Sequence, residues 1–176
     1  MKYLLIVLFP LLFACEKKEI PFEITPERFG KTSFRVYENA RIKRNAEFEG
    51  VGLAGAYEIL EGNKLVFEYI FVKDDDPQIA DDEFSETMVF ETDPGITEVT
   101  FKDGDILKQN AVYTYSCYCV PVNGLDTTEG TIHVKKKSAG SYQVEADVKF
   151  LFNAPENFQN DIISWEVDFN ETFIKK

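Results

Sequence analysis

The chain has 176 residues and a formal net charge of −12, with 31 acidic residues against 19 basic ones. This acidity argues against a nucleic-acid interface or an anionic membrane surface as a binding partner, because both require clustered basic side chains. The 16 Phe and 8 Tyr residues are typical of strand-rich domains, and the length allows one domain with a substantial hydrophobic core.

The N-terminus has the pattern of an export signal. Lys2 supplies a positive charge, and residues 3–14 form an apolar run that is interrupted only by Pro10. This run is too short to cross a hydrocarbon core as a helix, which needs about 20 residues. Its length and its basic flank predict a secretory signal peptide over residues 1–14.

The apolar run ends in Leu12-Phe13-Ala14-Cys15. This tetrapeptide resembles the lipobox of bacterial lipoprotein precursors, with Phe13 in place of the smaller residue usual at that position. In that family, a dedicated signal peptidase cuts before the cysteine, whose sulfur carries a diacylglycerol. The resemblance implies lipidation of Cys15 and a lipid-anchored protein in the outer membrane of a Gram-negative bacterium, facing either the periplasm or the cell surface. An ordinary signal peptide that ends at a cysteine is the alternative.

Residues 15–30 predict an extended tether between the lipidated cysteine and the folded domain. Charged residues follow Cys15 directly, in Glu16-Lys17-Lys18-Glu19, and two prolines come close behind. Charged, proline-containing segments of this kind stay extended. We expect the remainder, residues 31–176, to form a single β domain.

Apolar and polar residues alternate along most of the chain after the tether, which predicts half-buried β-strands. No segment there keeps a helical period for three turns. Three apolar stripes are the clearest, and each should face the protein interior. They are Leu65, Phe67, Tyr69 and Phe71; Tyr142, Val144, Ala146, Val148 and Phe150; and Ile163, Trp165, Val167 and Phe169.

Turn signals divide these strands, and we expect each to connect neighbouring antiparallel strands. Two of the turns predict a register. A two-residue loop at 123–124 pairs Tyr115 with Ile132, and a three-residue loop at 138–140 pairs Ile132 with Ala146. The turn signals are Gly62-Asn63, Asp93-Pro94-Gly95, Asp103-Gly104, Asn123-Gly124 and Ser138-Ala139-Gly140.

The predicted fold class is all-β, an antiparallel meander of about eight or nine strands. Such a meander closes into a lipocalin-like up-and-down barrel or packs as a β-sandwich, and the sequence leaves both open. A Greek-key topology would need a long crossing connection. Residues 74–83 and 152–161 are the candidates for one.

Cys117 and Cys119 remain after lipidation of Cys15, an even number that suits an oxidising compartment. Two positions apart on a straight strand, their β-carbons lie about 6–7 Å apart, whereas a disulfide needs roughly 3.5–4.5 Å. A bridge therefore requires a bulge or bend, and two buried thiols are the other structural possibility. A metal or redox site would recruit His133, which the predicted register places on the opposite face.

A cluster of carboxylates between positions 74 and 83 is the candidate metal site. Clustered oxygens suit calcium, which makes calcium the one candidate cofactor, although the EF-hand spacing fails. A solvated acidic loop is the favoured alternative. The expected calcium ligands are Asp74, Asp76, Asp81 and Asp82.

Tyr69, Tyr113, Tyr115 and Trp165 are candidates for lining a ligand cavity or stacking on a sugar, and core packing is the alternative. His133 as a catalytic base would need a nucleophile and an orienting carboxylate. Neither a nucleophile elbow nor a His-Glu-x-x-His helix is present in the sequence. We therefore expect a protein that is not an enzyme.

These expectations favour a lipid-anchored envelope protein that acts as a non-catalytic binding or interaction module. Its ligand would be a small apolar molecule or a glycan, or its partner another envelope protein. A structural or assembly accessory of an outer-membrane complex is the alternative, and an envelope hydrolase is a weaker one.

Overall fold

The computed structural model describes residues 30–45, 56–74, 83–117, 124–154, 156 and 162–176. Its eight strands form one sheet in the order β4-β6-β7-β8-β1-β2-β3-β5. The strands are β1 (Gly30–Arg44), β2 (Tyr57–Lys73), β3 (Ser85–Thr92), β4 (Glu98–Lys102), β5 (Val112–Ser116), β6 (Leu125–Ser138), β7 (Ser141–Asn153) and β8 (Ile162–Lys175). Two short 3-10 turns, η2 (Asp103–Asp105) and η3 (Leu107–Gln109), connect β4 to β5.

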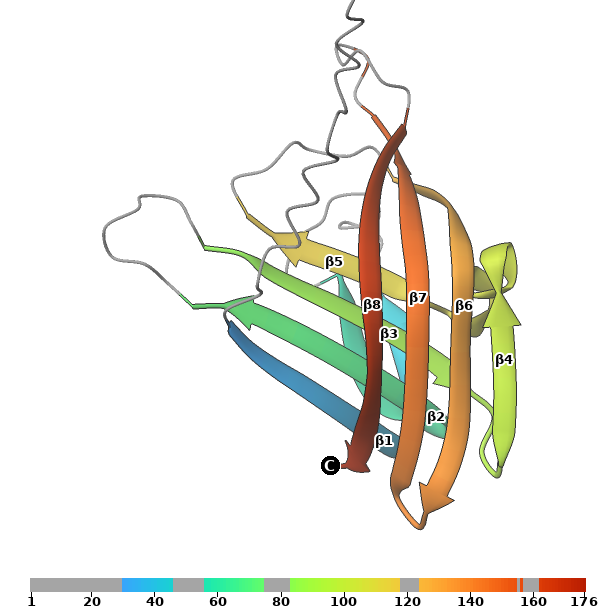
Figure 1. Cartoon of the computed structure of the whole chain (residues 1–176). Helices are drawn as coiled ribbons and strands as arrows, with labels where there is room; N and C mark the ends of the chain where they lie inside the picture. The colour runs from blue at the N-terminus through green and yellow to red at the C-terminus, as the bar shows by residue number, and fades with distance from the viewer. Residues whose placement is uncertain (1–29, 46–55, 75–82, 118–123, 155, 157–161) are drawn as a thin grey trace, which may run out of the picture.

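The sheet folds into two layers where β1 meets β8. These strands are parallel, and their described residues pair at two positions, Arg35 with Ile174 and Val36 with Lys175. Figure 1 shows β8, β7, β6 and β4 as one layer in front of β1, β2, β3 and β5, which run obliquely behind it. Within the described part of the chain the outermost strands, β4 and β5, do not pair, so the sheet is not closed into a barrel. The all-β prediction is confirmed, and the architecture is the β-sandwich.

Side chains from both layers fill the space between them. The predicted stripes on β2 and β7 are buried throughout, as is Val167 of the β8 stripe. Phe67 of β2 stacks on Phe90 of β3 with ring centroids 5.0 Å apart, and it meets the ring of Tyr142 of β7 edge-on at 5.3 Å. Full burial of a side chain of this size contributes about 1.5–3 kcal/mol. The aromatic interior is therefore a major source of stability.

The β6–β7 hairpin has the predicted register. Ile132 pairs with Ala146, and Val134 pairs with Val144. Gly140 has a φ of +71°, the left-handed conformation expected in a three-residue loop. The prediction from residues 138–140 is confirmed.

The predicted pairing of Tyr115 with Ile132 is wrong. β5 pairs with β3, so Tyr115 lies opposite Glu86, whereas Ile132 of β6 lies between Phe101 of β4 and Ala146 of β7. Both side chains still point into the core, one from each layer. Alternation specifies which face of a strand is buried, but two facing layers offer the same apolar environment. The pattern therefore left the partner strand undetermined.

Short connections, rather than long ones, carry the chain between the layers. The turn at 93–95 leads from β3 to β4 in the other layer, and Asp103-Gly104 begins η2 instead of closing a hairpin. The two candidate segments for a long crossing connection, 74–83 and 152–161, join adjacent strands, β2 to β3 and β7 to β8. The meander prediction is therefore wrong between β3 and β6.

Gly62-Asn63 is a bulge inside β2 and not the predicted hairpin turn. Leu60 and Leu65, on either side of it, both pair with β1, and the register shifts between them. Asn39 of β1 has a φ of +54° at the same place. A β-carbon on Gly62 would lie 2.6 Å from the carbonyl oxygen of Ala40. The close approach of the two strands therefore requires glycine.

Beyond the bulge, the end of the β1–β2 hairpin folds over the outer face of its own layer. The backbone N–H of Ile42 in β1 donates to the carboxylate of Glu91 in β3, although β2 lies between these strands in the sheet. Asn110, which follows η3, donates to the Ile42 carbonyl at 3.0 Å. The fold encloses a second small core on this outer face. Its buried members are Ala40, Ile42, Val66 and Val89.

Replacing Gly62 with alanine should destabilise the protein by about 1–3 kcal/mol, because the new methyl group overlaps the Ala40 carbonyl. Urea denaturation followed by circular dichroism measures the change. Gly104→Ala is the matched control, since its added β-carbon would lie 3.8 Å from the nearest atom, Thr127 Oγ1, and it should change stability by less than about 0.5 kcal/mol. Equal stabilities for Gly62→Ala and the unsubstituted protein would contradict the close approach.

Candidate functional site

The folded-over hairpin leaves a groove of about 510 Å³ on the outer face of the β1-β2-β3-β5 layer, the face turned away from β7 and β8 in Figure 1. We call it the outer groove. Its floor comes from β2, β3 and β5, one wall comes from the folded end of the hairpin, and β1 and the C-terminal end of the described chain complete the rim. The lining residues are Tyr37, Tyr57, Ile59, Glu68, Thr87, Thr114 and Lys176.

Glu68 is the central side chain of the outer groove. It is only 6% exposed, and its two carboxylate oxygens accept hydrogen bonds from Tyr37 at 2.7 Å and from Tyr57 at 2.8 Å. Arg35, its cross-strand neighbour, places Nη1 3.5 Å from Oε2. A buried carboxylate is costly unless it is paired and hydrogen-bonded. These contacts satisfy that requirement and hold both tyrosine side chains in place.

Both phenols of the outer groove stay protonated well above neutral pH. Burial, followed by the hydrogen bond to Glu68 and its negative charge, raises the pKa of Tyr37 to about 12. Burial and the nearby Glu68 carboxylate also raise the pKa of Tyr57. Both hydroxyl hydrogens are directed at Glu68, so the Tyr57 oxygen remains able to accept a hydrogen bond from a ligand.

Lys176 forms the basic rim of the outer groove. Its backbone N–H donates to the Val36 carbonyl at 3.1 Å, which holds the residue beside β1. Its Nζ donates to Tyr37 Oη at 3.4 Å and lies 5.3 Å from the centre of the Tyr37 ring. The ammonium group therefore sits over a ring whose orientation Glu68 fixes.

Three of the four aromatic candidates from the sequence, the tyrosines, lie inside the sandwich, and the fourth, Trp165, packs partly buried against the same core. Tyr69 and Tyr113 donate to the two oxygens of Glu86 at 2.6 and 2.9 Å, and the rings of Tyr115 and Trp165 lie 4.5 Å apart. The three tyrosines are 4–6% exposed, and Glu86 is 2% exposed. Their role in ligand binding stays a prediction, because in this structure they pack within the core.

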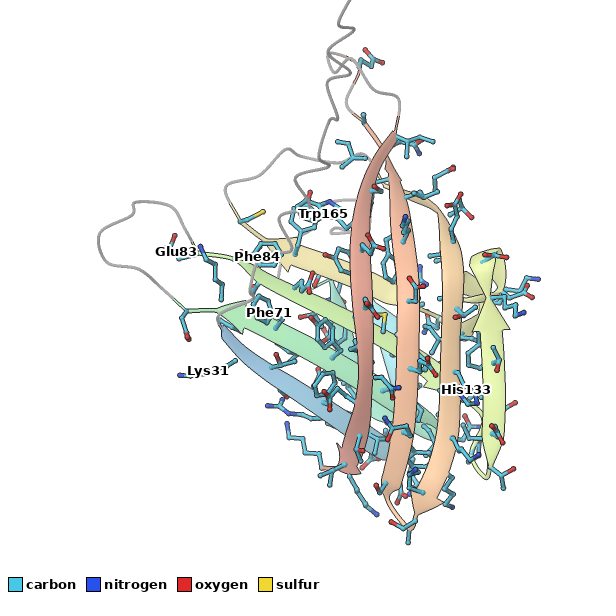
Figure 2. All side chains as sticks on the ribbon, in the orientation of Figure 1. Lys31, Phe71, Glu83, Phe84, His133 and Trp165 are labelled. Carbon is cyan, nitrogen blue, oxygen red and sulfur yellow. The ribbon has the colours of Figure 1, made fainter. Side chains whose placement is uncertain are left out.

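Aromatic side chains continue this cluster to one end of the sandwich. Figure 2 shows Trp165, Phe84 and Phe71 following one another there, and the rings of Phe84 and Trp165 stack with centroids 6.2 Å apart. The indole Nε1 of Trp165 is buried and has no hydrogen-bond partner among the described residues. Burial raises the pKa of Tyr115 beside it.

His133 lies far from this aromatic end in Figure 2, on the outward face of β6. Its Nε2 lies 2.9 Å from Glu98 Oε1 on β4, and Lys135 Nζ lies 3.6 Å from the same oxygen. The hydrogen bond to His133, followed by the charge of Lys135, lowers the pKa of Glu98. This geometry is that of a surface ion-pair network between two strands.

The cysteine and carboxylate candidates lie mostly outside the described residues. Cys117 is disulfide-bonded and packs against the edge of the core, and its pairing with Cys119 stays a prediction. Asp74 is exposed at the end of β2. Within the described ranges, no three His, Cys, Asp or Glu side chains form a group that could hold a metal ion. The candidates outside the described residues are Cys15, Cys119, Asp76, Asp81 and Asp82.

The sequence contained a signal for the outer groove that the alternation pattern alone did not reveal. Residues 65–69 read Leu-Val-Phe-Glu-Tyr, and all five are buried. An apolar residue at Val66 breaks the half-buried alternation and indicates a strand covered on both faces. A single carboxylate in such a run must be paired, so Glu68 was identifiable as a special position, although its partners were not.

No protein-family model matches this chain, and neither a curated protein nor a solved structure matches it. Among the described residues, no helix is long and apolar enough to cross a membrane. The chemistry of the outer groove is therefore the basis on which a function is assigned.

Replacing Tyr37 with phenylalanine should lower the free energy of unfolding at pH 7 by about 1–3 kcal/mol, because Glu68 loses one of its donors. The raised pKa of Tyr37 also predicts a pH dependence. A folded-state pKa of about 12 against an ordinary value of about 10 means that the stabilisation is complete below pH 10 and is lost as the pH rises towards 12. The phenolate absorbance of the unsubstituted protein minus that of Tyr37→Phe measures this titration. A midpoint near pH 10 would contradict the buried contact.

Proposed function

We propose that this protein is a lipid-anchored, non-catalytic binding module of the bacterial cell envelope and that the outer groove is its binding site. The Leu12–Cys15 sequence supports the anchor. The observation that carries the binding site is Glu68, a buried carboxylate that holds two tyrosines outside the main core. The groove volume of about 510 Å³ falls within the range of roughly 300–1,000 Å³ typical of small-molecule sites.

The energetic cost of the outer groove supports a binding role. Replacing a buried ion pair by well-packed apolar residues is often neutral or stabilising, so stability alone does not explain a carboxylate at Glu68. Beside it, Val66 and Val89 already form an apolar core under the same folded hairpin. A polar recess beside this apolar core presents hydrogen-bonding groups to a ligand, which supports the proposed recognition role.

The protonation states favour recognition over acid–base catalysis. Both oxygens of Glu68 accept from phenols, and the raised pKa values of Tyr37 and Tyr57 keep those phenols protonated near neutral pH. A catalytic base or nucleophile needs a pKa close to the working pH or an adjacent base. The groups that line the outer groove are poised to hold a ligand rather than to exchange protons with it.

The edge strand β4 is protected against the pairing with a partner's strand that an assembly accessory would require at that edge. β4 is short, spanning Glu98–Lys102, and both of its end residues are charged. Short edge strands with charged residues are a common protection against edge-to-edge pairing. The outer groove is therefore a better candidate for a functional surface than the β4 edge.

Lipidation is tested by growing cells with radiolabelled palmitate. The full-length protein should incorporate the label and Cys15→Ser should not, because the proposed acylation occurs on that cysteine. Cys117→Ser is the matched control and should keep the label, since Cys117 is disulfide-bonded. Label in Cys15→Ser, or a mature protein that still begins at Met1, would overturn the anchor.

Binding in the outer groove is tested in intact cells with the photoreactive residue p-benzoylphenylalanine. Placed at Ile59, in the groove wall, it should form a discrete adduct on illumination. Placed at Ile162, an exposed apolar position in the other layer that is 49% exposed, it should not. The absence of an adduct at Ile59, or equal adducts at both positions, would overturn the outer groove as the binding site.

A further inference from the structure

We infer that the ligand of the outer groove is a neutral saccharide, an inference that rests on the proposed binding function of this groove. The charges of this groove, its hydroxyl groups and its open shape all suit such a ligand.

The carboxylate on the floor of the outer groove is already compensated. Arg35 lies 3.5 Å from the Glu68 carboxylate, and both oxygens of Glu68 accept from phenols, so Glu68 has little capacity left for a cationic ligand. An anionic ligand would meet this buried carboxylate on the floor and a chain with a net charge of −12. Lys176 stands at the rim, where it donates to the neutral Tyr37 hydroxyl, and its remaining N–H groups can donate to neutral hydroxyl groups of a ligand. A polar ligand without net charge is therefore the best match.

Hydroxyl groups dominate the lining. Tyr37, Tyr57, Thr87 and Thr114 each contribute one, and Ile59 is the sole aliphatic residue among the lining side chains. The Tyr57 oxygen can accept a hydrogen bond, because its own hydrogen is committed to Glu68, whereas the Tyr37 oxygen already accepts from Lys176; threonine hydroxyls both donate and accept. Sugar hydroxyls have the same dual character, whereas a purely apolar ligand would leave these groups unpaired.

The hydroxyl groups are held on rigid elements. Thr87 of β3 and Thr114 of β5 are directly paired across two antiparallel strands, which places their β-carbons about 5 Å apart. The hydrogen bonds to Glu68 fix both tyrosines. Preorganised donors and acceptors reduce the entropy lost on binding, and the groove is open to solvent along one side. An open, preorganised recess accommodates part of a longer saccharide chain.

Isothermal titration calorimetry tests this inference on the acylated, detergent-solubilised protein, with maltohexaose, cellohexaose, laminarihexaose and mannohexaose as neutral probes. At least one should bind with a single site. Thr87→Val and Thr114→Val should each weaken that binding about three- to tenfold, because each substitution removes one hydrogen bond at nearly constant side-chain volume. Thr100→Val, the same change at an exposed position on β4, should leave the affinity unchanged. Thermal melting of each variant confirms that it is folded.

The outcomes separate this inference from the proposed function. Saccharide binding that is unaffected by both groove variants would overturn the assignment of the saccharide to the outer groove. If no neutral probe binds while the photoreactive residue in place of Ile59 cross-links to a protein, the saccharide inference fails and the proposed binding module stands. If no probe binds and no adduct forms, both fail.

Discussion

The bend at Gly62 is the constraint on which the rest of the outer groove depends. If the backbone at Gly62 could not approach the Ala40 carbonyl, the end of the β1–β2 hairpin would not fold back across its own layer. The folded end of the hairpin buries Val66 within the second small core. It also places Tyr57 over the floor of the outer groove, where Glu68 lies. Bulges bend strands and redirect side chains. Here one bulge converts the flat outer face of a sandwich layer into a recess with walls.

Glu68 and Glu86 show the same arrangement on opposite faces of one layer. Each is a buried carboxylate whose two oxygens accept from two tyrosines. The inner one joins three strands, because Tyr69, Glu86 and Tyr113 belong to β2, β3 and β5. The outer one joins the folded hairpin to β2. Breaking such a contact leaves an uncompensated charge, so the two clusters specify how the strands of this layer associate more sharply than apolar packing does.

The sequence predicts local patterns in this fold better than it predicts contacts between distant residues. The period of two identified the buried faces of β2, β7 and β8, and Gly140 identified a register, because both signals act within a few residues. Which strand pairs with Tyr115 depends on the layer that the chain enters after a short turn. The Tyr115 side chain faces the core in either layer, so the alternation pattern does not distinguish the two. Tyr37 and Glu68 are separated by 31 positions. The contact that builds the outer groove therefore had no local signature beyond a carboxylate in an apolar run.

The contact between Lys176 and Tyr37 spans 139 positions, and this separation determines when the rim of the outer groove can form. Contacts between distant residues require closure of a long loop and form late in folding. β1 can pair with β2 early, but the seam with β8 must wait for the strand at the far end of the sequence. Until β8 lies beside β1, the outer groove lacks the Lys176 ammonium that contacts Tyr37. Completion of the recess coincides with completion of the sheet.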